Sequence, residues 1–527
     1  MSSLRRRCAA AALALLVVLP THAYESPLPD LGDTSSEGLS ASDERQIGAS
    51  VMRELRRSGM LLDDPELTAY VNQLGGRLVD ASEDARASFT FLPLRDPSVN
   101  AFAVPGGVIA VHSGLIVMAQ HESELASVLA HEIAHVTQHH IARMIESQRV
   151  TPWMTLAALG LAILAAHAGH GDMAAAAAAA GPAMAIQRQL DFTYGFEQEA
   201  DRIGMQTLTR AGFDPSAMPV FFDRLQKHNR LVENNAPEFL RTHPVTYKRI
   251  ADAQARLKDM PYRQVPDSQD FLFMREKARV LQGDQRTMLD FYAKTLSEGR
   301  FANRAAHLYG YALAQLRNRD FAGAQKSLDG ARTAYGRAHP ALEYLQGQLL
   351  LAQGRPVEAA AQLKQAAQRF PGSRALVYGE IDARLAAGQL NDALALTHDA
   401  QELYPSDAEL YQREAKAYQG LGNAQRQHAA QAEYYVRLLE YTAAIEQLQI
   451  AQRQPGDDFY LLSRIEARLR ELQQDDESQR RKAGKPSSLD SSQALPAQPQ
   501  PPVEVGAPTN ARSTSRYRSG SGGMPWR

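Results

Sequence analysis

The sequence His131-Glu132-Ile133-Ala134-His135 decides how the rest of the chain is interpreted. Apolar residues recur through 125–136 at helical spacing, so these five residues are predicted to lie on a helix. Two histidines four positions apart then project from one helix face and can bind one metal ion, while Glu132 is placed to take a proton from water at that ion. The alternative is an amphipathic helix with two ordinary polar histidines, so a third ligand is needed.

A candidate for the third ligand lies in the segment Phe196-Glu197-Gln198-Glu199-Ala200-Asp201. Glu197 and Asp201 are four positions apart and share a helix face, whereas Glu199 projects away from it and is expected to be solvated. One carboxylate can complete a zinc site of two histidines and one acid, and the other can accept a hydrogen bond from a ligand imidazole. The alternative is an ordinary charged helix start.

The residues after the motif change in character. His139 and His140 extend the histidine run and are interpreted as solvated, or as groups that contact the ligands without binding the metal. Further on, Trp153 to Ala166 and Met173 to Ile186 are two apolar arms, each shorter than the ~20 residues that a spanning helix needs. We favour a helical hairpin beside the cleft, and a lid or a membrane-touching flap stays open.

Two extended segments are predicted before the motif, at 88–94 and 100–111. The sequence Pro105-Gly106-Gly107 interrupts the second segment and predicts a hairpin-like turn, and its proline favours a sheet edge. An exposed edge can pair with an extended peptide, and the alternative is a strand pair that only packs on the helix. Helical spacing over 42–81 indicates helices that buttress this core.

The length, the net charge and the N-terminal sequence limit the classes to which the protein can belong. A chain of 527 residues is expected to form several domains, and a formal charge of −2 gives no sign of nucleic-acid binding. Arg5-Arg6-Arg7, the apolar run from Cys8 to Leu19 and the small residue Ala23 predict an export signal over 1–23, followed by a loose leader over 24–41. Cleavage would remove the only cysteine, which excludes thiol chemistry in the mature chain.

A period of 34 residues marks the second half of the chain, because Gly354, Gly388 and Gly422 are equally spaced at that interval. This is the period of the tetratricopeptide repeat, whose helix pairs bury their apolar faces only by stacking on one another. We expect a repeat domain over 263–472 with a concave face that binds protein segments; a rigid spacer or a wall of the cleft is the alternative. Charged and proline-rich sequence predicts a disordered tail over 473–527.

Five stretches together resemble the M48 family of zinc metallopeptidases. The likeness covers about residues 42 to 260, within a predicted domain at 42–262. The stretches are the segment 100–107, Gly114-Leu115-Ile116, the segment 124–136, the segment 196–201, and Thr242-His243-Pro244 with Arg249. The resemblance implies an α+β, mostly helical fold, in which a zincin-like domain has a small mixed sheet flanked by helices. An all-α repeat array would follow it.

The resemblance also implies the roles of individual residues. His131, His135 and Glu197 would hold one Zn²⁺ per chain, and Asp201 would be the carboxylate that orients a ligand imidazole. Glu132 would act as the general base. A peptide substrate would bind along an edge strand of the sheet.

Two residues beyond the ligands are further candidates. His243 precedes a proline, which favours an extended backbone at this position. Its imidazole could stabilise the oxyanion of the transition state, or bind zinc as a fourth ligand and close the site; a helix-capping role is the alternative. Arg249 is a candidate for orienting the transition state, with an ordinary surface arginine as the alternative.

The function that we expect follows from the exported members of the family, since the hydrophobic spans of the integral-membrane members are replaced here by two short arms. They imply a periplasmic zinc endopeptidase, with a chaperone-like role beside proteolysis. Misassembled outer-membrane proteins would be its substrates, and the outer-membrane assembly machinery would be its partner through the repeats. The alternative is a non-proteolytic periplasmic chaperone or adaptor. Association with the outer membrane and peripheral membrane contact stay open.

Overall fold

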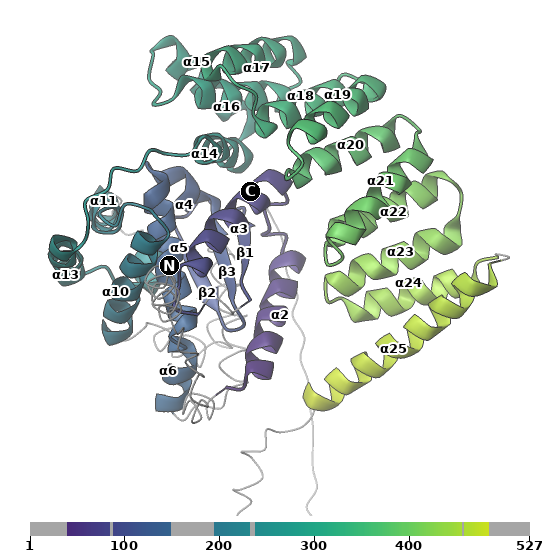
Figure 1. The fold of residues 1–527 in the computed structure, drawn as a ribbon, viewed down its shortest axis with the longest axis horizontal. Coiled ribbons are helices and arrows are strands. Elements are labelled where there is room, and N and C mark those ends of the chain that lie inside the picture. Colours follow the sequence, from purple (N-terminus) through teal and green to yellow (C-terminus); the bar gives the residue numbers. More distant parts are fainter. Residues whose placement is uncertain (1–38, 85–87, 149–193, 232–237, 456–457, 484–527) are drawn as a thin grey trace, which may run out of the picture. The chain divides into compact units, whose positions relative to one another are not determined.

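The computed structural model describes residues 39–84, 88–148, 194–231, 238–455 and 458–483 (Figure 1). The predicted export signal, most of the leader, the two apolar arms and most of the predicted tail lie outside these residues. Helices dominate the described chain, and none of them is both long and apolar enough to cross a bilayer. The predicted class, a mostly helical α+β protein, is confirmed.

Two helices begin the described chain, as the spacing over 42–81 predicted. Helix α2 (Ala41–Arg57) starts with a capping box, in which the Ser40 side chain accepts a hydrogen bond from the Asp43 backbone N–H and the Asp43 carboxylate accepts one from the Ser40 N–H. Helix α3 (Pro65–Asp80) begins with proline at its first position and with the Asp64 carboxylate accepting two backbone N–H groups. Both helices pack apolar faces on the sheet.

The sheet has three strands in the order β1-β3-β2 and is mixed, as predicted. Strand β1 (Thr90–Leu94) runs parallel to β3 (Val108–His112), and β2 (Ala101–Val104) runs antiparallel to it. The Pro-Gly-Gly sequence forms the predicted hairpin turn, with Gly106 at φ 83° and Gly107 at φ 76°, values that favour glycine. Consequently β2 lies at one edge of the described sheet.

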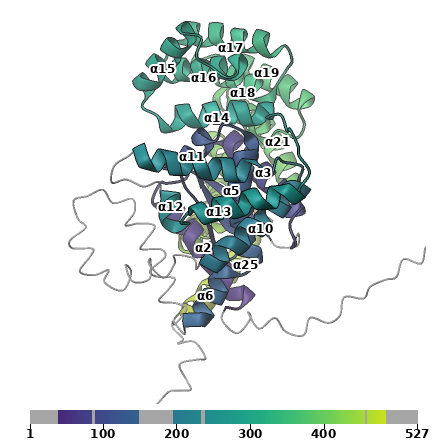
Figure 2. The same cartoon turned by 90° about the vertical axis from the view of Figure 1, so that its left-hand side faces the viewer.

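Seven further helices belong to this part of the described chain. Helix α5 (Glu122–Thr137) packs against α3 and β2, and α10 (Tyr194–Arg210) packs against α5. Figure 2 shows α11 (Ala217–Leu231) and α13 (Tyr247–Arg256) covering the side of this region that faces the viewer. The helices are α4 (Ser113–Met118), α5 (Glu122–Thr137), α6 (His140–Gln148), α10 (Tyr194–Arg210), α11 (Ala217–Leu231), α12 (Glu238–Thr242) and α13 (Tyr247–Arg256), and the 3₁₀ turn η2 (Leu257–Asp259) follows.

From residue 269 onward the described chain consists of helices, and each helix from α15 to α24 packs on its neighbour in sequence, which confirms the repeat array (Figure 1). Helix α25 continues to Ala483, although the tail was predicted to begin at about Gln473. The helices are α14 (Gln269–Gln282), α15 (Gln285–Ser297), α16 (Arg304–Arg317), α17 (Phe321–Tyr335), α18 (Pro340–Ala352), α19 (Pro356–Arg369), α20 (Arg374–Ala386), α21 (Leu390–Leu403), α22 (Ala408–Gly420), α23 (Ala424–Arg437), α24 (Tyr441–Arg453) and α25 (Phe459–Ala483).

The turns of the array explain its sequence period. Gly354, Gly388 and Gly422 each follow a helix and have φ between 71° and 74°, a left-handed conformation that glycine adopts without a steric cost. Arg319 and Leu439 occupy equivalent turns with φ of 62° and 61°. These two turns carry no glycine, so the glycine period could not reveal them.

A buried charge cluster ties the array to the helices around the sheet. The ammonium of Lys277 on α14 lies 2.6 Å from the Asp64 carboxylate and 2.5 Å from the Glu66 carboxylate, and the lysine is only 2% exposed. One cluster of buried apolar side chains also extends through both regions and includes residues from Leu62 to Leu345. Burial raises the pKa of Glu66, and Lys277 opposes that rise.

Replacing Lys277 by Met should destabilise the protein by about 3–5 kcal/mol, because two buried carboxylates lose their cation. The loss should be larger at pH 8 than at pH 5.5. Without the ammonium the pKa of Glu66 rises further above its unfolded value, so stability is retained at low pH and is lost as the pH rises. Urea denaturation at both pH values measures this.

The matched control is the triple variant Asp64→Asn, Glu66→Gln, Lys277→Met, which removes all three charges and keeps a side chain that can cap α3. It should recover much of the stability that the single Lys277→Met variant loses. A single variant as stable as the wild type, or equally destabilised at both pH values, would contradict the assignment of this cluster as a buried ion network.

Candidate metal centre

Helix α5 carries the histidine motif through the interior of the protein, as its apolar spacing predicted. Every residue of α5 from Glu122 to His135 is buried, and His131 and His135 are 0% and 2% exposed. The neighbouring helix α10 approaches closely at Gly204, where a Cβ atom would lie 3.2 Å from the backbone nitrogen of His131. This contact brings the acidic first turns of α10 next to the two imidazoles.

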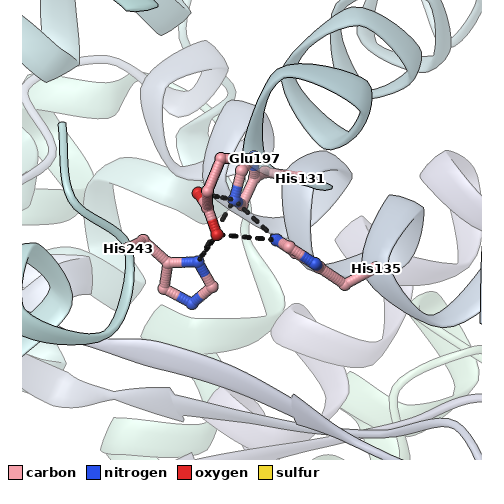
Figure 3. A group of neighbouring side chains, drawn as sticks. All are labelled: His131, His135, Glu197 and His243. Carbon is pink, nitrogen blue, oxygen red and sulfur yellow. Dashed lines mark hydrogen bonds and ion pairs between the residues drawn. The ribbon is translucent and has the colours of Figure 1, made fainter. Parts of the chain in front are cut away.

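Four buried side chains meet at this point: His131, His135, Glu197 and His243 (Figure 3). One nitrogen or oxygen from each lies within 4.8 Å of all the others. The Nε2 atoms of His131 and His135 are 3.0 Å apart, and they lie 3.4 Å and 3.5 Å from the Glu197 carboxylate. The structure therefore brings together the three predicted ligands, from two helices distant in sequence, and adds His243.

The residues fit a divalent metal ion. The ring nitrogens that face away from the centre have partners, since His131 Nδ1 lies 3.0 Å from Asp201 Oδ1 and His135 Nδ1 lies 2.8 Å from His140 Nδ1. The Nε2 atoms are therefore the ring nitrogens that face the Glu197 carboxylate and each other. Two imidazoles and one carboxylate, buried and aimed at one point, form a donor set that suits zinc.

Arg249 is buried and contacts two of the acids. Its Nε and Nη2 atoms each donate to Asp201 at 2.7 Å, and its Nη1 lies 2.7 Å from the Glu197 carboxylate. The side chain is 1% exposed, so the alternative of a surface arginine is wrong. Its guanidinium compensates the charge of both carboxylates, and burial of an acid pair would otherwise be costly.

Glu132 lies beside the four converging side chains. Its Oε2 accepts a hydrogen bond of 3.1 Å from the Ala103 N–H on β2, and its Oε1 lies 3.5 Å from His243 Nε2. Burial raises the pKa of Glu132, and the nearby imidazoles oppose that rise. A carboxylate held by a strand backbone in this way can exchange a proton with a group bound between β2 and the imidazoles.

His243 projects from the segment between α12 and α13. Its backbone N–H donates to the Phe239 carbonyl at 2.7 Å, and its ring stacks on the Phe239 ring with centroids 4.9 Å apart. Its Nδ1 lies 3.0 Å from Glu197 Oε1. The alternative of a helix-capping histidine is wrong for α13, because the Thr246 side chain caps that helix.

Electrostatics in the site favour protons or cations. Burial alone lowers the pKa of His131, but hydrogen bonds with Asp201 and Glu197 outweigh it and raise this pKa to about 9. Burial raises the pKa of Glu197, yet the charges and hydrogen bonds of His243 and His131 hold it well below its usual range. The centre is therefore a negative pocket that attracts a cation.

Two residues near the site make a contact that the sequence alone did not identify. Glu199, which was predicted to be solvated, has a side chain that is 29% accessible, and its Oε2 also lies 3.2 Å from His140 Nε2 and 3.0 Å from Arg143 Nη1. His140 is completely buried against His135, as the second interpretation of the histidine run expects. Spacing on α10 could not reveal this contact, because it depends on how α6 turns back over α5.

Fold and site together define a metallopeptidase built around a buried H-E-x-x-H helix. Comparison with known sequences identifies its family. The profile of peptidase family M48 matches residues 65–257, and a tetratricopeptide repeat profile matches residues 350–426. The chain belongs to the M48 metallopeptidases, which are metal-dependent.

Three similar relatives show how far the likeness extends. The chain is 34% identical to the beta-barrel assembly-enhancing protease of Escherichia coli over 88% of this chain and 95% of that protein. It is 40% identical to a putative beta-barrel assembly-enhancing protease of Vibrio cholerae, over 59% of this chain and 64% of that protein. Mitochondrial metalloendopeptidase OMA1 of Schizosaccharomyces pombe is 31% identical over 35% of this chain and 51% of its own length.

Proposed function

We propose that this chain is an exported zinc endopeptidase that acts on outer-membrane β-barrel proteins during their assembly. The observation that carries the hydrolytic part is the convergence of two imidazoles and one carboxylate beside Glu132. The substrate class is supported by the relative that is similar over 88% of this chain, a beta-barrel assembly-enhancing protease. The export signal over 1–23 supports a periplasmic location.

His131, His135 and Glu197 would hold the zinc ion. When bound, zinc would polarise the peptide carbonyl and make a nearby water more acidic. Glu132 would accept the proton from the attacking water at Oε1, while the Ala103 N–H holds Oε2, and would then deliver the proton to the leaving amine. Since Ala103 lies on the edge strand β2, the base and a peptide paired with that edge would be held in register.

Asp201 and Arg249 would position the ligands. Asp201 would accept the Nδ1 proton of His131, which leaves the Nε2 lone pair for the metal. Arg249 would hold Asp201 with two hydrogen bonds and Glu197 with a third contact. We therefore propose that Arg249 positions both acids and does not contact the transition state directly.

His243 would be a fourth ligand that closes the site. Its Nδ1 lies 3.4 Å from His131 Nε2 and 3.0 Å from Glu197 Oε1, inside the same group of donor atoms. A zinc site with four protein ligands has no open position and is inactive as a catalyst. Movement of the segment between α12 and α13 would open the site. The closed form would then have the chaperone-like role.

The repeat array would recruit the partner. Stacked tetratricopeptide helices form an extended surface for protein segments, and the outer-membrane assembly machinery is the partner that this function requires. A purely non-proteolytic chaperone or adaptor is the second candidate, and the inclusion of His243 among the donor atoms favours it. The two candidates differ in whether Glu132 is needed.

Replacing Glu132 by Gln should lower cleavage of an unfolded casein-type substrate by about 10²–10⁴-fold, because the general base is lost. Zinc content and the circular dichroism spectrum should be unchanged, since Glu132 is outside the proposed ligand set. The control is Glu446→Gln, which alters an exposed glutamate on α24. Cleavage at the wild-type rate by Glu132→Gln would refute its role, and full complementation of a deletion strain would favour the adaptor.

Replacing His243 by Ala should raise the rate of casein cleavage several-fold, because the fourth ligand is removed and the site opens. His398→Ala, at an exposed histidine on α21, is the control and should have no effect. A lower rate in His243→Ala would instead assign the imidazole to the oxyanion, and an unchanged rate would remove both roles.

A further inference from the structure

The turn between α5 and α6 places an imidazole against the back of a proposed metal ligand. His139 ends the turn in the left-handed region, with φ of 50°, and α6 starts at the next residue. The chain thereby reverses, and His140 is buried against His135, with ring centroids 4.9 Å apart. A non-glycine residue at positive φ is uncommon and persists only where the surrounding contacts hold it.

His140 is held on three sides. Its Nδ1 lies 2.8 Å from His135 Nδ1, and its Nε2 lies 3.2 Å from the Glu199 carboxylate. Its ring stacks on Phe196 with centroids 4.7 Å apart and 20° between the planes. Arg143, one turn further along α6, holds Glu199 at 3.0 Å. The ring has little freedom to rotate.

The protons in this chain of contacts can be assigned from the acceptors. An ionised carboxylate only accepts, so His140 donates to Glu199 from Nε2. A neutral imidazole carries one proton, which leaves Nδ1 of His140 as an acceptor. His135 must then donate from its own Nδ1, and its Nε2 is left with a lone pair that points at Glu197 and His131.

We propose that His140 and Glu199 are positioning residues that fix the tautomer and ring orientation of His135 for metal binding. The inference rests on the proposed zinc site. It gives α10 three carboxylates with separate tasks: Glu197 faces the metal, Asp201 orients His131 directly, and Glu199 orients His135 through His140. Residues that hold a metal ligand from outside change metal affinity about 10–100-fold when removed.

The test is the zinc affinity of the full mature chain, stripped of metal and titrated against a chromophoric chelator that competes for zinc. His140→Leu removes the acceptor and should weaken zinc binding by about 10–100-fold. His140→Asn places an amide oxygen near the position of Nδ1 and should keep an affinity closer to the wild type. His139→Asn is the matched control, since asparagine tolerates the left-handed turn and the imidazole contact is left intact.

The outcomes separate the inference from the site on which it rests. A wild-type chain that binds no zinc would overturn the proposed zinc site itself. If the wild type binds zinc and His140→Leu binds it equally well, with an unchanged melting temperature of the metal-free form, the positioning role is wrong. An asparagine variant as weak as the leucine variant would also overturn the role of the acceptor.

A second variant covers the case in which His140→Leu does not fold. Glu199 is partly exposed, with a side chain 29% accessible, so its removal puts little strain on the core. Glu199→Ala should still weaken zinc binding, because His140 loses the acceptor that fixes its own tautomer. Wild-type zinc affinity in a folded Glu199→Ala chain would overturn the proposal.

Discussion

The contact between α5 and α10 is the constraint on which the rest of the site depends. Two imidazoles on one helix do not make a metal centre until an acid from elsewhere reaches them, and the acid comes from a helix more than fifty residues away. Gly204 allows the two backbones to approach, because a Cβ atom at this position would lie only 3.2 Å from the backbone nitrogen of His131. Helix α10 therefore sits where its first turns reach both histidines.

That contact concentrates charge in the interior, and the surrounding residues compensate it. Glu132, Glu197 and Asp201 are all buried, and carboxylates in an apolar interior are costly unless they are paired. Arg249 pairs with two of these acids, and the backbone of β2 donates to the third. Burial alone would lower the pKa of His131, but its hydrogen bonds with Asp201 and Glu197 raise that pKa to about 9. Such a pocket is arranged to hold a cation.

Local patterns predicted those parts of the fold that have a local cause. The helical spacing around His131, the Pro-Gly-Gly turn and the glycine period all correspond to observed elements. The turns at Arg319 and Leu439 escaped detection, since neither uses the residue that such turns favour. The contact between His140 and Glu199 also escaped, because it joins two helices through a reversal that no sequence period encodes.

The zinc content of the purified mature chain, compared with that of the Glu197→Ala variant, tests the central claim most directly. Mass spectrometry of metals should find one zinc per wild-type chain, and much less than one in the variant, with unchanged circular dichroism of both proteins. A folded Glu197→Ala chain that keeps one zinc would contradict the account, because the ion would then be held without the acid that joins the two helices.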